Sequence, residues 1–94
     1  METKRSKFNL GRIVATPGAL DTFEQSGEGS RVLLARHASG DWGEICKDDW
    51  QENEFALDKY LRLFSVYRLR DGTKIWVITE ADRSVTTILL PSEY

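Results

Sequence analysis

The sequence predicts an α+β fold in one domain over residues 1–94, and three observations predict it. Apolar positions recur at helical spacing between residues 50 and 61, residues 63–70 alternate as a strand does, and Asp71-Gly72 marks a turn between two strands. Because 94 residues bury one hydrophobic core, these elements belong to a single domain. We expect an N-terminal strand or arm, two to three helices and a three-stranded antiparallel meander (β-α-α-α-β-β-β), with the helices packed on one sheet face.

The first third of the chain predicts a strand and two helices. Residues 8–15 (FNLGRIVA) are short and apolar, which indicates a strand or extended arm. Thr16 can cap a helix with its hydroxyl, and Pro17 suits the first helical position because its missing N–H is not needed there. Gly27 predicts the end of that helix. A second helix is expected between residue 30 and the Ser39-Gly40 break.

A third helix is expected from Asp48 to about Tyr60. Asp48 and Gln51 have the spacing of a capping box, which marks a helix start. Trp50, Leu57 and Leu61 recur near helical spacing and define an apolar stripe. The acidic residues between them leave much of the circumference in water.

The C-terminal third alternates with the period of a strand. Residues 63–70 and 74–80 flank Asp71-Gly72, a dipeptide typical of a type I′ hairpin turn. A polar turn at 81–84 leads to a third strand over 85–90. The expected members of one sheet face are Phe64, Val66, Trp76, Ile78, Ile88 and Leu90.

Composition excludes several classes of protein. The chain is 40% hydrophobic and 30% charged, as ordinary globular domains are. No apolar run reaches the roughly 18 residues of a membrane span, so no membrane partner is expected, and the N-terminus lacks the apolar core of a signal peptide. Cys46 and His37 are the only residues of their types and fall short of a structural zinc site, so we expect no metal and no cofactor. Cys46 is expected to be a small buried residue.

Charge is distributed unevenly behind a net charge of −2. Residues 1–12 hold four basic residues and one acidic residue, and we interpret residues 1–7 as a basic N-terminal arm, with disorder left open. Residues 13–60 hold ten acidic and four basic residues, whereas residues 61–94 hold five basic and four acidic ones. The acidic middle either keeps the domain soluble or meets a basic partner, and the basic C-terminal third could meet phosphates.

Three stretches together resemble a known protein family. They are FNLGRIVATPGAL at 8–20, LLARHASGDWGEI at 33–45 and YRLRDGTKIWVITEADRSVTTILLPSEY at 67–94. The resemblance is to small proteins encoded on bacterial plasmids, integrative elements and prophages, usually described only as plasmid-related. It implies a mobile-element origin and action in the bacterial cytoplasm, and it brings no known activity.

A second resemblance concerns architecture. Helices followed by a meander, with a histidine before the sheet, are similar to the RelE, barnase and colicin group of small RNases. That resemblance implies metal-independent cleavage by the adjacent 2′-OH, which needs a base, a cation for the phosphate and an acid. The residues that match these parts are His37, Arg68 or Arg70, Arg83, Ser84, Thr86 and Thr87.

Each candidate catalytic residue has a second interpretation. His37 would be the general acid or base, or it would bond free carbonyls at a helix C-terminus. Arg83 and Arg68 would hold the scissile phosphate while Ser84 or Thr86 orients it, or Arg83 would be solvated in an ordinary polar turn. Whether the protein is an enzyme therefore stays open.

The alternative function is non-catalytic binding. A small mobile-element protein with an acidic middle suits an inhibitor of a host defence complex, such as an anti-CRISPR protein. Trp42 either anchors a partner or fills a seam between helix and sheet. The contact surface of this hypothesis consists of Asp41, Trp42, Glu44, Asp48, Asp49, Trp50 and Glu52. The expected partner is a host protein or ribonucleoprotein complex, with RNA as a further candidate, and the protein is a monomer or a homodimer.

Overall fold

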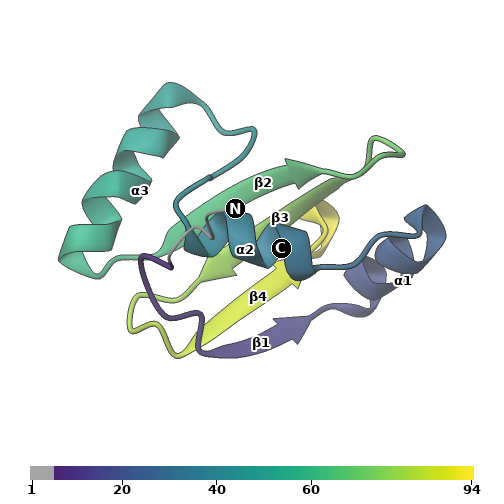
Figure 1. Ribbon diagram of the computed structural model, residues 1–94, viewed down its shortest axis with the longest axis horizontal. Helices are drawn as coiled ribbons and strands as arrows, with labels where there is room; N and C mark the ends of the chain where they lie inside the picture. Colours follow the sequence, from purple (N-terminus) through teal and green to yellow (C-terminus); the bar gives the residue numbers. More distant parts are fainter. Residues whose placement is uncertain (1–5) are drawn as a thin grey trace, which may run out of the picture.

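The computed structural model describes residues 6–94, and its three α-helices precede β2, β3 and β4 (Figure 1). The helices are α1 at Pro17–Ser26, α2 at Arg31–Ala38 and α3 at Lys47–Lys59. Thr16 caps α1 as predicted, because its hydroxyl accepts a hydrogen bond from the Ala19 N–H at 3.2 Å. Gly27 ends α1 with a left-handed φ of 71°. Residues 1–5 of the predicted basic arm lie outside the described residues.

Four strands form one mixed sheet in the order β1-β4-β3-β2. The strands are β1 at Arg12–Ala15, β2 at Leu63–Arg68, β3 at Lys74–Thr79 and β4 at Val85–Leu89, followed by the 3-10 helix η1 at Pro91–Glu93. β2, β3 and β4 form the predicted antiparallel meander, and β1 joins it as a fourth strand parallel to β4. The α+β prediction and its element order are confirmed.

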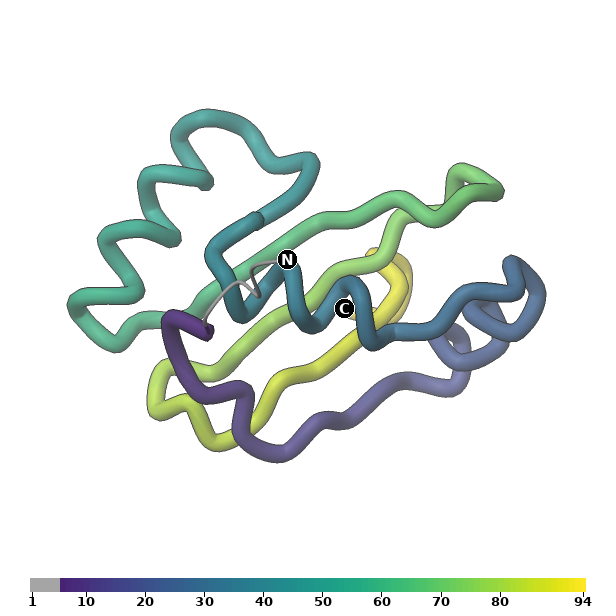
Figure 2. Tube along the Cα trace, viewed as in Figure 1, coloured from purple at the N-terminus to yellow at the C-terminus, as the bar shows by residue number. Residues whose placement is uncertain are grey.

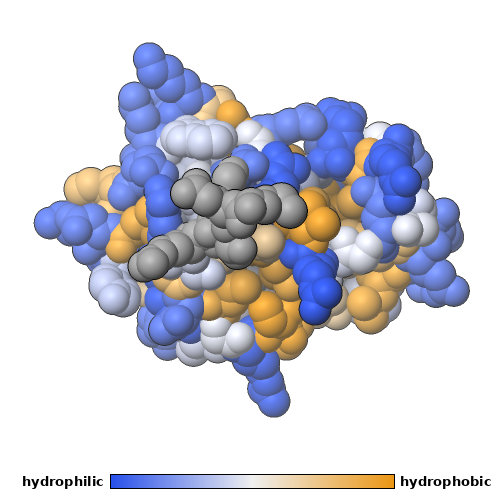
Figure 3. Space-filling model, in the orientation of Figure 1, coloured by the Kyte–Doolittle hydropathy of each residue, from blue (hydrophilic) through white to orange (hydrophobic). Residues whose placement is uncertain are grey.

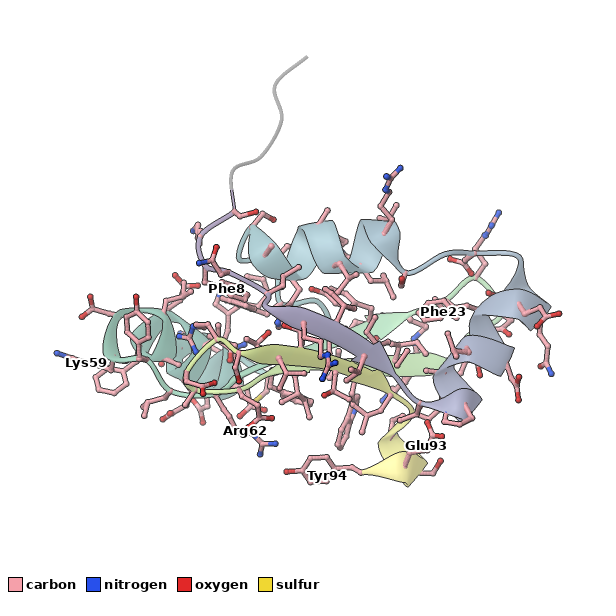
Figure 4. The ribbon with its side chains drawn as sticks, turned by 90° about the horizontal axis from the view of Figure 1, so that it is seen from below. Phe8, Phe23, Lys59, Arg62, Glu93 and Tyr94 are labelled. Carbon is pink, nitrogen blue, oxygen red and sulfur yellow. The ribbon has the colours of Figure 1, made fainter. Side chains whose placement is uncertain are left out.

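All three helices contribute buried residues to one side of the sheet, which we call the covered face. The larger core cluster there unites α1 and α2 with the strands through Ala19, Phe23, Leu33, Tyr67, Leu69, Ile75, Val77 and Ile88. A second cluster joins Ala56 of α3 to Trp42 and Leu63. In the edge-on view α2 lies above the sheet, while η1 and Tyr94 lie below it (Figure 4). α2 thus lies over this face as predicted, whereas α3 lies along the outer edge of β2 and reaches the covered face through Ala56 (Figure 1).

The prediction of which residues share the other face is wrong for β4. Ile88 and Leu90 pack with the core on the covered face. The register explains this, because Ile88 lies opposite Val77, a core residue. A shift of one residue along a strand reverses its faces, and the sequence of β4 alone does not show the shift. The second face, which we call the open face, carries Phe64, Val66, Trp76, Ile78, Thr87 and Leu89.

The turn between β2 and β3 differs from the predicted type I′ form. Only Gly72 has a positive φ, at 90°, and Asp71 does not. The Gly72 N–H donates to the Leu69 carbonyl, and the Leu69 N–H donates to the Thr73 carbonyl, which closes a longer turn. The Asp71 carboxylate accepts from the Thr73 N–H at 3.0 Å, so this aspartate stabilises the turn through its side chain.

Cys46 is exposed, contrary to prediction, and helix α3 begins at Lys47. The Cys46 sulfur takes the N-cap position and accepts from the Asp49 N–H at 3.5 Å. Asp48 and Asp49 then fall in the first helical turn, where the helix dipole favours carboxylates.

The outer edge of β2 is closed by the segment that leads into α3. The Val66 N–H donates to the Trp42 carbonyl, and the Glu44 N–H donates to the Val66 carbonyl. These two hydrogen bonds form an isolated parallel β-bridge between Gly43 and Val66. Gly43 permits this approach, since a Cβ there would lie 2.0 Å from the Val66 carbonyl oxygen. Asn53 of α3 bonds both backbone groups of Phe64, at 2.6 and 3.1 Å. These contacts fix α3 beside the sheet.

The other edge strand, β1, carries exposed hydrophobic residues. Ile13 is 43% exposed and Val14 is 39% exposed. On the side that carries α2, hydrophobic residues gather over β1 (Figure 3). Within residues 6–94, no helix is long and apolar enough to cross a membrane.

Candidate functional site

His37 lies in the interior, near the C-terminal end of α2. Its side chain is fully buried, and the rings of Phe8 and Trp42 lie edge to face with it at centroid distances of 5.2 and 5.5 Å. Both ring nitrogens are occupied: Nδ1 lies 2.5 Å from Ser65 Oγ, and Nε2 lies 2.9 Å from Thr79 Oγ1. Neither nitrogen is left for a substrate.

The hydroxyl groups beside His37 form a chain whose direction fixes the tautomer of the ring. Thr86 Oγ1 donates its single proton to the Leu10 carbonyl at 2.7 Å. Thr79 Oγ1 must then donate to Thr86 across their 2.7 Å contact. Thr79 therefore accepts from His37 Nε2, and Ser65 donates to Nδ1. His37 is a neutral imidazole that links α2 to β2, β3 and β4.

The same surroundings keep His37 uncharged. Burial lowers the pKa of His37 from 6.5 to about 3, and the positive charge of Arg83 acts in the same direction. A general acid or base works best with a pKa near the operating pH. Geometry and pKa thus both favour the structural interpretation of His37.

Arg83 is buried in the turn between β3 and β4, with 8% of its surface exposed. Its guanidinium donates to four backbone carbonyls, those of Ala56 at 2.9 Å, Leu61 at 2.6 Å, Glu80 at 3.2 Å and Ala81 at 3.1 Å. The Ala56 and Glu80 carbonyls also accept backbone N–H groups, from Leu61 at 3.1 Å and from Arg83 at 2.9 Å. For these two carbonyls the guanidinium is a second donor. Arg83 thus ties the end of α3 to the β3–β4 turn and is not a solvated turn residue.

An aromatic ring lies near both His37 and Arg83. Arg83 Cζ is 5.7 Å from the centroid of the Phe8 ring, which also meets the His37 ring, and 5.1 Å from that of Tyr60. The N-terminal segment runs beside the β3–β4 turn, which brings Phe8 to this position (Figure 2). A cavity of about 490 Å³ opens beside Arg83, lined by Ser6, Lys7, Phe8, Asn9, Leu57, Tyr60, Asp82 and Arg83. His37 does not line it.

The remaining candidate catalytic residues are spread over the molecule. Arg68 ends β2 beside the β2–β3 turn, whereas Arg83 and Ser84 lie in the β3–β4 turn at the other end of β3. Arg68 forms an ion pair with Glu44 at 3.3 Å, and Ser84 is exposed. Thr86 is buried in the hydroxyl chain beside His37. The structure does not bring the five side chains of the RNA-cleavage hypothesis to one place.

Trp42 fills the seam between α3 and the sheet, which is one of the two roles predicted for it; the other was to anchor a partner. It is fully buried, and its Nε1 donates to the Glu54 carboxylate at 2.8 Å. Asp41 binds the Arg36 guanidinium at 2.7 Å and is half-buried. Of the predicted contact residues before α3, only Glu44 is exposed, and it pairs with Arg68.

Helix α3 exposes the remaining predicted contact residues, Asp48, Asp49, Trp50 and Glu52. It also exposes Phe55, which was not among the predicted contact residues. Phe55 is 55% exposed, more than Trp50 at 36%. We define the outer face of α3 by its members Asp48, Gln51, Glu52, Phe55, Asp58 and Lys59, which follow helical spacing. The buried residues of α3 are Asn53 and Ala56, and Phe55 does not share their side of the helix. The predicted apolar stripe does not mark the core side, because Trp50 and Leu61 are exposed. In Figure 3 the region of α3 is mostly hydrophilic.

The acidic residues of α3 do not assemble a metal centre. Residues 6–94 contain no group of three or more His, Cys, Asp or Glu side chains that could hold a metal ion. Comparisons with protein-family models, curated proteins and solved structures find no match to the chain.

Proposed function

We propose that this protein is a non-catalytic binding protein of a bacterial mobile genetic element. It acts in the host cytoplasm by docking the outer face of α3 on a defence complex. The observation that supports this most strongly is Phe55, an aromatic side chain 55% exposed among carboxylates. The three stretches at 8–20, 33–45 and 67–94 are the basis for the mobile-element origin. The internal bonding of His37 and Arg83 favours binding over catalysis.

Charge indicates what kind of surface α3 recognises. Within residues 6–94, no ion pair neutralises Asp48, Asp49 or Glu52, whereas Glu54 is bound inward by Trp42. A row of free carboxylates is complementary to a cluster of lysines and arginines. Proteins display such clusters where they bind nucleic-acid phosphates. The partner is therefore a nucleic-acid-binding protein, and α3 occupies its phosphate-binding surface.

Phe55 supplies the apolar anchor of this interface. Aromatic side chains are enriched at the centres of interfaces, where a few residues carry most of the binding energy. Charged residues around such an anchor form the rim and speed association. Phe55 lies between Glu52 and Asp58 on the helix, at i−3 and i+3, which matches this arrangement.

Photo-crosslinking in the bacterial host tests the proposal. A benzophenone amino acid at position 55 is expected to form an adduct with a nucleic-acid-binding protein, which mass spectrometry identifies. The wild-type protein is then expected to displace nucleic acid from that partner. Phe55→Ala is expected to weaken the displacement about tenfold, because it removes the central anchor. Glu52→Lys is expected to weaken it through charge repulsion.

Val32 provides the matched control, because it is an exposed apolar residue of α2, at 66% exposure. The crosslinker at position 32 is expected to form no such adduct, and Val32→Ala is expected to displace nucleic acid like the wild type. Equal adducts at positions 32 and 55, or a partner that keeps its nucleic acid, would contradict the proposal. Cleavage of RNA by the purified protein in EDTA would restore the endoribonuclease hypothesis instead.

A further inference from the structure

The open face of the sheet is left without a covering α-helix within residues 6–94, because α1, α2 and α3 all contribute their core residues to the other face. In the edge-on view Arg62, Glu93 and Tyr94 lie on the side of the sheet opposite α2 (Figure 4). η1 is held there by Glu93, whose carboxylate accepts hydrogen bonds from the Thr16 hydroxyl and the Gly18 N–H. Tyr94 is thereby placed over the sheet while remaining 70% exposed.

Three aromatic rings surround a pocket on this face. Trp76 lies 5.0 Å from the Phe64 ring and 5.5 Å from the Tyr94 ring, in edge-to-face arrangements at interplanar angles of 87° and 63°. The pocket has a volume of about 310 Å³ and is lined by Arg62, Leu63, Phe64, Trp76, Ile78 and Tyr94. That volume is at the lower end of ligand pockets and suits one flat ring system rather than a large ligand.

Positive charges flank the pocket along the strands. The register places Arg12 of β1 and Lys74 of β3 on the open face, opposite Val85 and Arg68. Within residues 6–94, neither Arg12 nor Lys74 forms an ion pair, whereas Arg62 and Arg68 are paired with Glu80 and Glu44. Two unneutralised cations, one toward each end of the sheet, favour an anionic ligand that runs across it.

We propose that the open face binds single-stranded nucleic acid, with one base stacked in the pocket formed by Phe64, Trp76 and Tyr94 and with phosphates at Lys74 and Arg12. Aromatic rings on a sheet surface stack unpaired bases, and neighbouring cations follow the backbone. An apolar side chain of a protein would fill the pocket equally well, but it would not use the cations at both ends. This surface is separate from the outer face of α3, so the inference does not depend on the proposed function.

Fluorescence anisotropy with a labelled uridine oligonucleotide of about ten nucleotides tests the proposal at roughly 50 mM salt. Tyr94→Ala is expected to weaken binding about tenfold, because it removes a stacking wall. Tyr94→Phe keeps the ring and is expected to bind like the wild type. Tyr94 is suited to this test since its exposure leaves the core unchanged on substitution.

The salt dependence tests the cations separately. Each phosphate contact on a single strand contributes about 0.7 to the slope of log affinity against log salt, so Lys74→Ala and Arg12→Ala are each expected to lower the slope by about 0.7. Arg31→Ala is the matched control, because Arg31 is an exposed arginine at the start of α2 that forms no ion pair within residues 6–94. Phe55→Ala, which tests α3, is expected to leave oligonucleotide binding unchanged.

Several results would overturn the proposal. They are an absence of binding, an unchanged affinity for Tyr94→Ala, and equal effects of Arg31→Ala and Arg12→Ala. If the pocket instead bound an apolar segment of a protein, the oligonucleotide would not bind, which is the first of these results. None of them bears on the displacement assay with Phe55→Ala, so the two proposals fail separately.

Discussion

Replacing Arg83 by alanine is expected to lower the free energy of unfolding by about 3 kcal/mol or more. The guanidinium joins four carbonyls from the end of α3 and the β3–β4 turn, and a hydrogen bond to a charged group contributes roughly 1.5–3 kcal/mol. Alanine would remove the side-chain donor from all four carbonyls, and within residues 6–94 only those of Ala56 and Glu80 would keep a donor from the backbone, at Leu61 and Arg83. The left-handed φ of 61° would remain. Urea denaturation followed by circular dichroism measures the loss.

Two variants serve as controls for Arg83. Arg70→Ala removes an arginine whose side chain is 75% exposed, and it is expected to cost roughly 1 kcal/mol or less. Arg83→Lys keeps the charge without the planar fork and is expected to recover only part of the loss. If Arg83→Ala were as stable as Arg70→Ala, Arg83 would be free to contact a phosphate, contrary to the structure.

Acidification from pH 7.5 to pH 5 is expected to remove about 2 kcal/mol of stability through His37 alone. Burial lowers the pKa of His37 to about 3 in the folded protein, against 6.5 in the unfolded chain. Between these values the unfolded chain binds the additional proton, so stability rises with pH across this window. The contribution is fully present above pH 6.5 and is lost as the pH falls toward 3.

The variant His37→Gln isolates this effect, because it removes the titrating group. Its stability at pH 7.5 is expected to be lower than that of the wild type, since the hydroxyl chain through Ser65 and Thr79 is disturbed. Its change between pH 7.5 and pH 5 is expected to be about 2 kcal/mol smaller. Equal pH dependence in both proteins would show that His37 titrates alike in the folded and unfolded states.

The elements of the fold were predictable because their signals are local. Thr16 and Pro17 mark the start of α1, and the alternation over 63–70 marks β2. Two features depend on how the strands pair and were not predictable. β1 pairs with β4 across more than two thirds of the chain. The register of β4 against β3 decides which face Ile88 occupies.

In the candidate site, too, local sequence predicted some features, and others depend on the folded structure. The sequence supplies residue types that suit RNA cleavage, but their exposure depends on the folded structure. His37 and Arg83 are buried and bonded to the protein itself, and Trp42 fills a seam. Phe55 was not singled out from the sequence. The apolar stripe predicted for α3 does not mark its buried side, which carries Asn53 and Ala56, while Trp50 and Leu61 are exposed.

The ring protons of His37 provide the most direct test of the claim that His37 is a buried structural residue and not a catalytic acid or base. His37 is the only histidine in the chain, so its NMR signal is unambiguous. Because the pKa of His37 is lowered to about 3, its chemical shift is expected to stay constant between pH 8 and pH 5. Nitrogen shifts are expected to show the proton on Nε2. A titration with a midpoint near pH 6.5 would contradict the account and return His37 to the candidate acids and bases.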